Sequence, residues 1–505
     1  MPARPGPPRG TGPPLRLDAL APRLLGSEVH GDAAVDVTEV TYDSRRAGPG
    51  TLFVAVRGLT ADGNQFVDAA RRKGAAAVAS ENPPQPGGPW IQVPDARRAL
   101  AAFSAAVLGD PARALTLVGV TGTNGKTTTS YLIDAAVRAA GHTAGLLGTV
   151  QYRIGDRLSE AVRTTPEASD LQQLFREMVV ASCTHAVLEV SSHSLALDRV
   201  YGCAFKVAVF TNLTRDHLDF HGDMDRYFEA KRRLFDTFLA RDGRAILNAE
   251  DDRTPALAAA SRAPVWTYGI DHPAHFQAED ISLSLDATRF RLRSPQGVFA
   301  VETPLLGRFN VQNLLAAFAA SMALDLDPQD VLTGLTSIQG VPGRLERVHA
   351  GQAFTVVVDY AHTDDALKKV LETVRQLKPN RLITVFGCGG DRDRSKRPLM
   401  GAVATRLSDV VIVTSDNPRS EPPEAILEEI QKGMNGGRGA ERHAIVDRRD
   451  AIARALEMAR PGDAVVIAGK GHETYQQLRD RTIPFDDRQV ARDVLSRLAS
   501  RTGKR

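Results

Sequence analysis

Short apolar runs that end in polar or glycine-rich segments recur along most of the chain, and stretches with helical spacing of apolar residues lie between them. The first complete example is residues 115–120 (LTLVGV), a pattern typical of a buried strand. Apolar residues then follow at helical spacing from 132 to 140, and Gly141 stands where a glycine often ends a helix. This alternation predicts βα units around mainly parallel sheets, and therefore an α/β fold.

The same order of apolar run and polar end returns in six further segments: THAVLEVSS (184–192), KVAVFTNL (206–213), FTVVVDYAH (354–362), RLITVFGCGG (381–390), DVVIVTSDNP (409–418) and DAVVIAGKG (463–471). In open parallel sheets, ligands bind at the carboxyl ends of the strands. We therefore expect the functional side chains at the polar ends of these runs.

The length of 505 residues predicts about three domains at roughly 150 residues each. Breaks in the pattern occur at LGDPAR (108–113) and at IQGVPGR (338–344). We therefore expect a smaller N-terminal α/β domain, a central domain with a mostly parallel sheet and a C-terminal Rossmann-like domain, over residues 15–114, 115–340 and 341–505.

Composition narrows the class of protein. Hydrophobic residues make up 43% of the chain and charged residues 24%, as in ordinary globular proteins. The net charge of +3 is small for this length, so a nucleic-acid partner is not expected. No run of about 18 apolar residues occurs, so no membrane-spanning segment or membrane partner is expected either.

The N-terminus and the cysteines indicate the compartment. Residues 1–14 contain six prolines and three glycines and lack an apolar signal-peptide core, which predicts a disordered tail. Three cysteines, an odd number without C-x-x-C spacing, favour a reducing compartment: Cys183, Cys203 and Cys388. We expect a cytoplasmic protein.

Residues 119–129 (GVTGTNGKTTT) join the first strand to its helix through a glycine-rich turn. Backbone amides at such a turn converge on phosphate oxygens, a lysine adds charge at the β/γ-phosphates and a hydroxyl reaches Mg²⁺. The G-x-x-x-x-G-K-[ST] pattern is missed by one place, because position 120 is Val. A turn that only caps the helix is the alternative. We expect a nucleotide loop with these ATP-binding residues: Gly122, Thr123, Asn124, Gly125, Lys126, Thr127 and Thr128.

At this loop the chain resembles the Mur ligase family, the ATP-dependent amide-forming enzymes of peptidoglycan precursor synthesis. The segments that carry the resemblance, besides GTNGKTT, span residues 43–473: DSR (43–45), TTPE (164–167), EVSSH (189–193), NLTRDHLDFHG (212–222), GRFNVQN (307–313), PGR (342–344), DYAHT (359–363), GCGGDRDRSKRP (387–398), DNPR (416–419) and GKGHE (469–473). Within the family, DSR, TTPE, DNPR and GKGHE are most similar to the ligases that add the third residue of the stem peptide.

The resemblance implies an ADP-forming acid–amino-acid ligase with ATP and Mg²⁺ as cofactors. It would add meso-diaminopimelate to UDP-N-acetylmuramoyl-L-alanyl-D-glutamate through an acyl phosphate. The N-terminal domain would bind the UDP substrate, the central P-loop-type domain ATP, and the C-terminal domain the amino acid. We expect a monomer whose partners are these small molecules.

Activation of a carboxylate by ATP brings two anions together, so cations must neutralise them. Glu189 ends an apolar run and could hold Mg²⁺ beside Thr127, and His217 in the next loop could complete a second metal site. By themselves these would be an ordinary strand-end carboxylate and a loop histidine. Lys231 lies in a predicted helix, where a lysine is normally a surface charge. The resemblance implies that it is carbamylated to carboxylysine and positions Mg²⁺.

Further nucleotide contacts follow from the resemblance. Asn310 and Asn313 are one helical turn apart and could hydrogen-bond adenine, or cap the helix. Arg344 could reach the γ-phosphate once the third domain closes, which would also exclude water. Asp359 and His362 resemble the family's ribose and nucleotide contacts.

The two substrates of the ligation have their own candidates. For the UDP substrate, the resemblance implies residues 59–61 and the following side chains: Ser44, Thr164, Thr165, Ser191 and Arg199. The sequence departs from the family at Leu197, where glutamine is frequent, and Ser44 alone could be a turn serine. For the amino acid, two arginines could grip the distal carboxylate and Glu473 the distal ammonium. The full set is Arg392, Asp416, Asn417, Pro418, Arg419, Gly469 and Glu473.

Three alternatives remain open. The same fold could add L-lysine or L-ornithine, which lack the distal carboxylate. A folylpolyglutamate synthase shares the phosphate loop, but would not be expected to carry DSR, DNPR and GKGHE. A non-enzymatic nucleotide-binding regulator is disfavoured by the carboxylate, histidine and lysine candidates beyond the loop.

Overall fold

The structure is a computed structural model that describes residues 13–59, 61–436 and 439–502. The expected tail over residues 1–14 lies outside these ranges except for its last two positions. The chain forms two compact units. The first comprises Met1–Gln277, Ser294–Gln296 and Gln312–Leu335, and the second Ala278–Arg293, Gly297–Val311 and Thr336–Arg505.

The N-terminal part of the first unit is a five-stranded sheet of order β2-β7-β6-β5-β4, parallel except for β2. Helix α3 packs Leu100 and Phe103 against its core, and Asp95 caps this helix by accepting from two backbone amides. The bounds are β2 (Glu28–His30), β4 (Glu39–Thr41), β5 (Thr51–Val54), β6 (Ala77–Ser80), β7 (Trp90–Gln92), α1 (Leu17–Leu20), α2 (Val67–Arg72) and α3 (Ala96–Val107).

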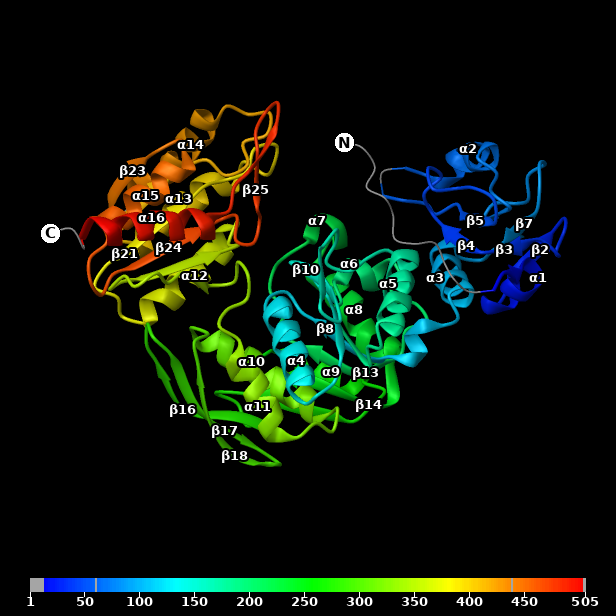
Figure 1. The fold of residues 1–505 in the computed structure, drawn as a ribbon, viewed down its shortest axis with the longest axis horizontal. Helices are drawn as coiled ribbons and strands as arrows, with labels where there is room; N and C mark the ends of the chain where they lie inside the picture. The colour runs from blue at the N-terminus through cyan, green and yellow to red at the C-terminus, as the bar shows by residue number, and fades with distance from the viewer. Residues whose placement is uncertain (1–12, 60, 437–438, 503–505) are drawn as a thin grey trace. The chain divides into compact units, whose positions relative to one another are not determined.

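The larger sheet of the first unit has the strand order β11-β10-β9-β12-β8-β13-β14-β15. Strands β8, β10, β13 and β14 are labelled in Figure 1. The middle strands of this sheet are parallel, so the carboxyl ends of neighbours β12, β8 and β13 meet at one edge. The strands are β8 (Thr116–Thr121), β9 (Ala144–Leu147), β10 (Gln151–Ile154), β11 (Arg157–Glu160), β12 (His185–Glu189), β13 (Phe205–Phe210), β14 (Leu239–Asn248) and β15 (Val265–Gly269). The helices are α4 (Lys126–Ala139), α5 (Ala168–Val180), α6 (Ser192–Ala196), α7 (Leu218–His221), α8 (Met224–Arg233), α9 (Thr254–Ala260), α10 (Arg308–Met322) and α11 (Pro328–Ser337).

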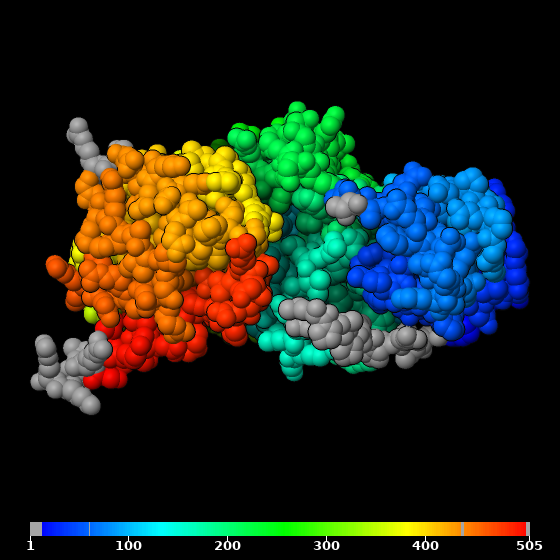
Figure 2. Space-filling view, turned by 90° about the horizontal axis from the view of Figure 1, so that it is seen from above, coloured from blue at the N-terminus to red at the C-terminus, as the bar shows by residue number. Residues whose placement is uncertain are grey.

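The second unit contains a six-stranded sheet of order β19-β20-β24-β21-β22-β23, parallel except for β19. Helices α12, α13 and α14 pack on one face of the sheet, and α15 and α16 pack on the other (Figure 1). The C-terminal part of this unit is yellow to red in the space-filling view (Figure 2). The bounds are β19 (Glu346–Arg347), β20 (Thr355–Asp359), β21 (Leu382–Phe386), β22 (Val410–Val413), β23 (Glu441–Ala444), β24 (Ala464–Ala468), β25 (Tyr475–Gln477), β26 (Thr482–Pro484), α12 (Asp364–Gln376), α13 (Lys396–Leu407), α14 (Pro423–Lys432), α15 (Arg448–Met458) and α16 (Asp487–Thr502).

The predicted βα units are confirmed. Each of the seven apolar runs contains one strand: β8, β12, β13, β20, β21, β22 or β24. The first predicted helix is α4, which ends at Ala139, and Gly141 follows with a left-handed φ of 81°. Among the described residues, no helix is long and apolar enough to cross a bilayer.

The strands that were not predicted from the sequence include β16 (Phe276–Leu283), β17 (Thr288–Ser294) and β18 (Gly297–Thr303). Along β17, buried and exposed residues alternate, so it lacks the continuous apolar run that identifies a buried parallel strand.

Candidate active site

The predicted phosphate loop lies between the end of β8 and the start of α4. Gly122 and Gly125 have φ values of 146° and 85°, which favour glycine, and a side chain at Gly122 would collide with Thr211. The Lys126 Nζ donates to the carbonyls of Gly122 and Thr123, both at 2.9 Å. The Lys126 side chain therefore lies back over the loop, at the N-terminus of the 14-residue helix α4.

The segment after β13 forms hydrogen bonds with this loop. The Asn124 amide donates to the Asn212 side-chain oxygen at 3.0 Å, and the Thr123 hydroxyl donates to the Thr214 carbonyl at 3.1 Å. Asn313 on α10 also contacts this region, since its Oδ1 is 3.3 Å from the Thr129 hydroxyl. Asn313 thus contacts the loop region itself.

Glu189 is fully buried at the end of β12, next to the first turn of α4. Its Oε2 accepts from the Thr127 hydroxyl at 3.1 Å and from the Thr149 hydroxyl at 3.0 Å. Its Oε1 accepts from the Thr149 amide at 2.8 Å. Within the described ranges this carboxylate forms no ion pair, although an isolated buried charge is costly. Carboxylate and hydroxyl oxygens are ligands that Mg²⁺ prefers, so this pair of residues fits the ion.

His217 lies beside the loop in a left-handed conformation, with a φ of 53°. Its ring centroid is 4.8 Å from that of His193 and 6.2 Å from that of Tyr227. Partial burial lowers the pKa of the imidazole; the charge of Asp216 opposes this shift, and the charge of Lys126 reinforces it. A neutral ring leaves a nitrogen lone pair available for a metal. No cluster of three His, Cys, Asp or Glu side chains that could hold a metal occurs in the described part of the chain.

Lys231 is 1% exposed on α8, so it is not a surface charge. Its Nζ donates to the Gly122 carbonyl at 2.8 Å and lies 4.4 Å from the centre of the Tyr227 ring. Burial, reinforced by the nearby charge of Lys126, holds the pKa of this amine well below its ordinary value. The amine therefore gives up its proton more readily than the amine of an exposed lysine, and the neutral amine is the nucleophilic form.

The two motifs expected to bind the sugar-peptide lie in contact. The Thr165 hydroxyl donates to the Glu189 carbonyl at 2.8 Å and accepts from the Ser191 amide at 3.2 Å. Arg199 donates to the Thr165 carbonyl at 3.1 Å and pairs with Glu167 at 2.7 Å. These side chains therefore form one polar group beside the buried carboxylate.

Thr164 joins the same group through Thr149, since their hydroxyl oxygens are 3.1 Å apart. Thr149 was not expected from the sequence. It lies between β9 and β10, and its contacts with Glu189 arise because β9 pairs with β12.

The segment that contains Ser44 forms hydrogen bonds with α5. The Tyr42 hydroxyl donates to Asp170 at 3.3 Å, and Arg46 donates to the other oxygen of Asp170 at 3.0 Å. Since α5 follows directly after TTPE, these contacts link the two motifs expected to bind the UDP substrate. Arg98 of α3 adds an ion pair with Asp198 at 3.3 Å, next to Arg199.

In the second unit, Asp359 holds the turn that carries Arg344. Its carboxylate accepts from the backbone amides of Leu345 at 2.7 Å and Ala361 at 2.8 Å. Burial raises the pKa of this carboxyl. Arg344 lies 5.3 Å from the centre of the Tyr360 ring. These contacts support a positioning role for Asp359, in addition to the nucleotide contact expected from the resemblance.

The other two nucleotide candidates of this unit contact backbone. His362 places Nδ1 2.9 Å from the Tyr360 carbonyl oxygen, and burial lowers the pKa of its imidazole. The buried Asn310 side chain donates to the Leu306 carbonyl at 2.8 Å.

The amino-acid candidates gather at the ends of β22 and β24. Asn417 is buried, and its Nδ2 donates to Glu473 Oε2 at 2.8 Å. Gly469 has a φ of 115°, and a Cβ there would lie 2.7 Å from Asp416 Oδ2. Pro418 is buried beside them. The predicted set thus forms a connected group at the carboxyl edge of the sheet.

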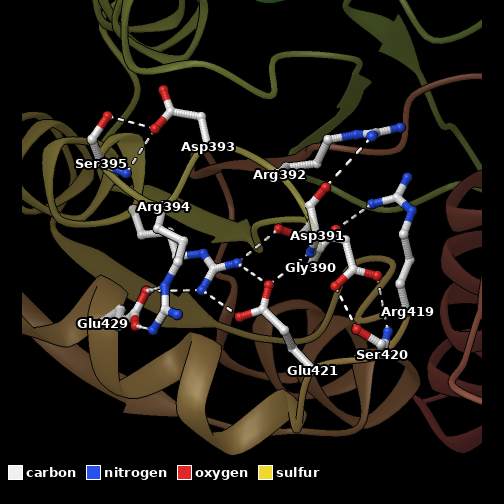
Figure 3. Close-up of polar contacts among 12 residues, drawn as sticks. Gly390, Asp391, Arg392, Asp393, Arg394, Ser395, Arg419, Ser420, Glu421 and Glu429 are labelled. Carbon is white, nitrogen blue, oxygen red and sulfur yellow. Dashed lines mark hydrogen bonds and ion pairs between the residues drawn. The ribbon is translucent and has the colours of Figure 1, made fainter. Parts of the chain in front are cut away.

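The arginine candidates lie on two loops that hydrogen-bond to each other, one after β21 and one after β22 (Figure 3). Arg419 donates to the Gly390 carbonyl at 2.7 Å, and the Asp391 carboxylate accepts from the Ser420 hydroxyl at 2.5 Å. The Arg392 and Arg419 side chains extend on the same side of these loops (Figure 3), and both lie next to Gly389. Arg392 is exposed and Arg419 half-buried, so both can reach a ligand.

Arg397 and Lys470, two of the buried cations of this unit, were missed in the sequence. Arg397 is fully buried and donates to Glu421 at 2.8 Å and to Glu429 at 2.8 Å. Its hydrogen bonds lower the pKa of Glu421 to about 2. Lys470 is likewise fully buried. The only signal for them in the sequence was their position, Arg397 within GCGGDRDRSKRP and Lys470 within GKGHE.

Comparison with known proteins gives three family matches in order along the chain. "Mur ligase family, catalytic domain" matches residues 36–107, "Mur ligase middle domain" residues 120–321, and "Mur ligase, glutamate ligase domain" residues 343–471. The matches follow the expected order of three domains. The boundaries at 114 and 340 stay predictions.

Individual proteins agree with these matches. A protein of Solibacter usitatus named UDP-N-acetylmuramoyl-L-alanyl-D-glutamate–2,6-diaminopimelate ligase is 50% identical over 478 residues, 94% of this chain and 96% of that protein. A solved structure of a ligase of this name has a TM-score of 0.73 and 36% identity, covering 96% of this chain and 99% of its own. A Mycobacterium tuberculosis folylpolyglutamate synthase, solved with ADP and AMPPCP, has a TM-score of 0.59 at 22% identity, covering 74% of this chain and 92% of its own. That last likeness is one of fold alone.

Proposed function

Because this chain belongs to the Mur ligase family, we propose that it joins meso-diaminopimelate to UDP-N-acetylmuramoyl-L-alanyl-D-glutamate with conversion of ATP to ADP and phosphate. The observation that carries the choice of amino acid is that Arg392 and Arg419 both lie next to Gly389, while Asn417, two residues before Arg419, donates to Glu473 at 2.8 Å. The distal end of meso-diaminopimelate holds one carboxylate and one ammonium, which these groups complement.

Nucleotide binding is assigned to the loop from Gly122 to Thr128. Backbone amides at the start of α4 would hold the phosphates, and Lys126 would supply a positive charge. Asn310, Asn313, Asp359 and His362 remain the proposed contacts to the nucleoside. Arg344 would add charge at the γ-phosphate.

Thr127 and Glu189 would hold Mg²⁺, with His217 at a second metal position. Bound Mg²⁺ supplies positive charge that offsets repulsion between the substrate carboxylate and the γ-phosphate. The support is the fully buried Glu189 carboxylate with its hydroxyl neighbour Thr127 at 3.1 Å.

Lys231 is proposed to carry a carbamate. In its neutral form, Nζ would form an N–C bond with CO₂ and release one proton, which leaves an anionic carboxylate on the side chain. The support is the burial of the amine and its lowered pKa. An anion here would lie beside the phosphate loop, where it could orient a cation.

The reaction then takes two steps. The substrate carboxylate attacks the γ-phosphorus, and the bond from phosphorus to ADP breaks to give an acyl phosphate. The amino group of the incoming amino acid next attacks the acyl carbon, the amide C–N bond forms, phosphate leaves and the nitrogen loses a proton. Ser44, Thr164, Thr165, Ser191 and Arg199 are proposed to hold the first substrate. Asp416, Asn417, Pro418 and Gly469 would shape the site of the second.

The compartment proposed is the cytoplasm. Cys183, Cys203 and Cys388 are buried free thiols, which is consistent with a reducing environment. The monomeric state stays a prediction.

An assay of ADP release tests the proposed function. ADP should form only when the UDP-muramoyl-dipeptide and meso-diaminopimelate are both present with ATP and Mg²⁺. Glutamate with a folate substrate should give none. Release that does not depend on the amino acid would contradict the proposal.

A further inference from the structure

Lys470 lies at the centre of the amino-acid group, with its side chain fully buried. Its Nζ donates to Asn417 Oδ1 at 3.1 Å and to Glu473 Oε2 at 3.0 Å, and lies 3.7 Å from Asp416 Oδ1. The ring of Tyr475 is 5.5 Å from the same nitrogen. A cation of this chain therefore occupies the acidic subsite that the amino acid is expected to use.

The contacts of Lys470 also orient its neighbours. Asn417 Oδ1 accepts from both Lys470 and the Gln477 amide, the latter at 2.9 Å. This leaves Asn417 Nδ2 to donate to Glu473, so one oxygen of Glu473 receives two donors. A ligand ammonium would then use the second oxygen of Glu473.

The charge balance of this subsite depends on Lys470. Asp416 is 6% exposed and the Glu473 side chain 18% exposed, so both carboxylates are poorly solvated. With Lys470 their net charge is −1, and without it −2. The distal end of L-lysine is a bare cation, whereas that of meso-diaminopimelate carries a carboxylate as well and is neutral overall.

We propose that Lys470 is a specificity-determining residue, whose ammonium partly neutralises Asp416 and Glu473 and so disfavours amino acids that end in an ammonium alone. Like-charge repulsion between Lys470 and an unaccompanied ligand ammonium gives the discrimination. The inference rests on the proposed function, because it assumes that these residues hold the distal end of the amino acid.

The test compares Lys470→Gln with the wild-type full chain. Glutamine keeps a hydrogen-bond donor near Asn417 and Glu473 but removes the charge. We expect the ratio of kcat/KM for meso-diaminopimelate over that for L-lysine to fall at least tenfold, through KM, while the KM for ATP stays unchanged. Lys470→Arg keeps the charge and should retain the preference. The exposed Lys432, at the end of α14, provides the control Lys432→Gln, which should leave both values unchanged.

The outcomes separate the inference from the proposed function. A wild type that ignores meso-diaminopimelate would overturn the proposed function. A Lys470→Gln variant that loses activity equally with both amino acids would show that Lys470 only maintains structure. If thermal unfolding shows that Lys470→Gln does not fold, Lys470→Arg decides alone, because loss of its preference for meso-diaminopimelate would overturn the inference.

Discussion

Arg419→Ala is expected to weaken binding of meso-diaminopimelate without affecting ATP. In the structure, one guanidinium nitrogen donates to the Gly390 carbonyl at 2.7 Å. A guanidinium has five N–H donors, so the remaining ones can form a fork with a carboxylate. Loss of such a charge-assisted bond costs about 1.5–3 kcal/mol, which corresponds to a rise in KM of roughly ten- to hundredfold.

The variant should remain folded. Residue 419 has a left-handed φ of 52°, and alanine, like arginine, carries a Cβ, so the backbone strain is unchanged. The loop stays tied by the bond of Ser420 to Asp391 and by the pairing of Glu421 with Arg397. A change in melting temperature of only a few degrees is expected, from the loss of one hydrogen bond of about 1 kcal/mol.

The assay is steady-state ADP release with meso-diaminopimelate varied at saturating ATP, and then with ATP varied. Arg419→Lys is the matched control, since it keeps the charge but lacks the planar fork and should give an intermediate KM. An unchanged KM for meso-diaminopimelate, or an equal rise in the KM for ATP, would refute the assignment.

Three further perturbations probe other parts of the account. Lys126→Ala should abolish ADP formation while the protein remains folded by circular dichroism; near-normal turnover would refute the role of the phosphate loop. Lys231→Ala should be nearly inactive and regain part of its activity when a short carboxylate is added. A wild-type protein that is fully active while mass spectrometry shows an unmodified Lys231 would exclude the carbamate. Arg397→Met leaves Glu421 without its ion-pair partner and Glu429 with Arg394 alone, so the protein should lose about 3 kcal/mol, the low end for a buried pair because both carboxylates are partly exposed. An unchanged midpoint of thermal unfolding for Arg397→Met would contradict that reasoning.

The strands and the phosphate loop could be predicted because their signals are local. A buried parallel strand needs a continuous apolar run, and the loop needs glycine where side chains would collide, as at Gly122. The predicted position of the site rests on the same pattern, because polar residues such as Glu189 end the strands. The antiparallel β10 and β11 and the strand β17 lack such a run, and their contribution to the sheets could not be predicted.

The environment of the charged side chains could not be predicted from the sequence. Lys231, Arg397 and Lys470 are fully or almost fully buried, although lysine and arginine are usually exposed. Their burial depends on partners far along the chain, such as Gly122 for Lys231 and Glu421 for Arg397. The resemblance predicts the role of Lys231, but only packing indicates that the pKa of its amine is lowered.

The most direct test of the proposed function is a competition analysed by mass spectrometry. The protein is incubated with ATP, Mg²⁺, the UDP-muramoyl-dipeptide and equal concentrations of meso-diaminopimelate, L-lysine and L-ornithine. The account predicts that the dominant product has the mass of the nucleotide substrate plus one meso-diaminopimelate minus one water. A dominant product that contains L-lysine or L-ornithine, or no ligated product at all, would contradict it.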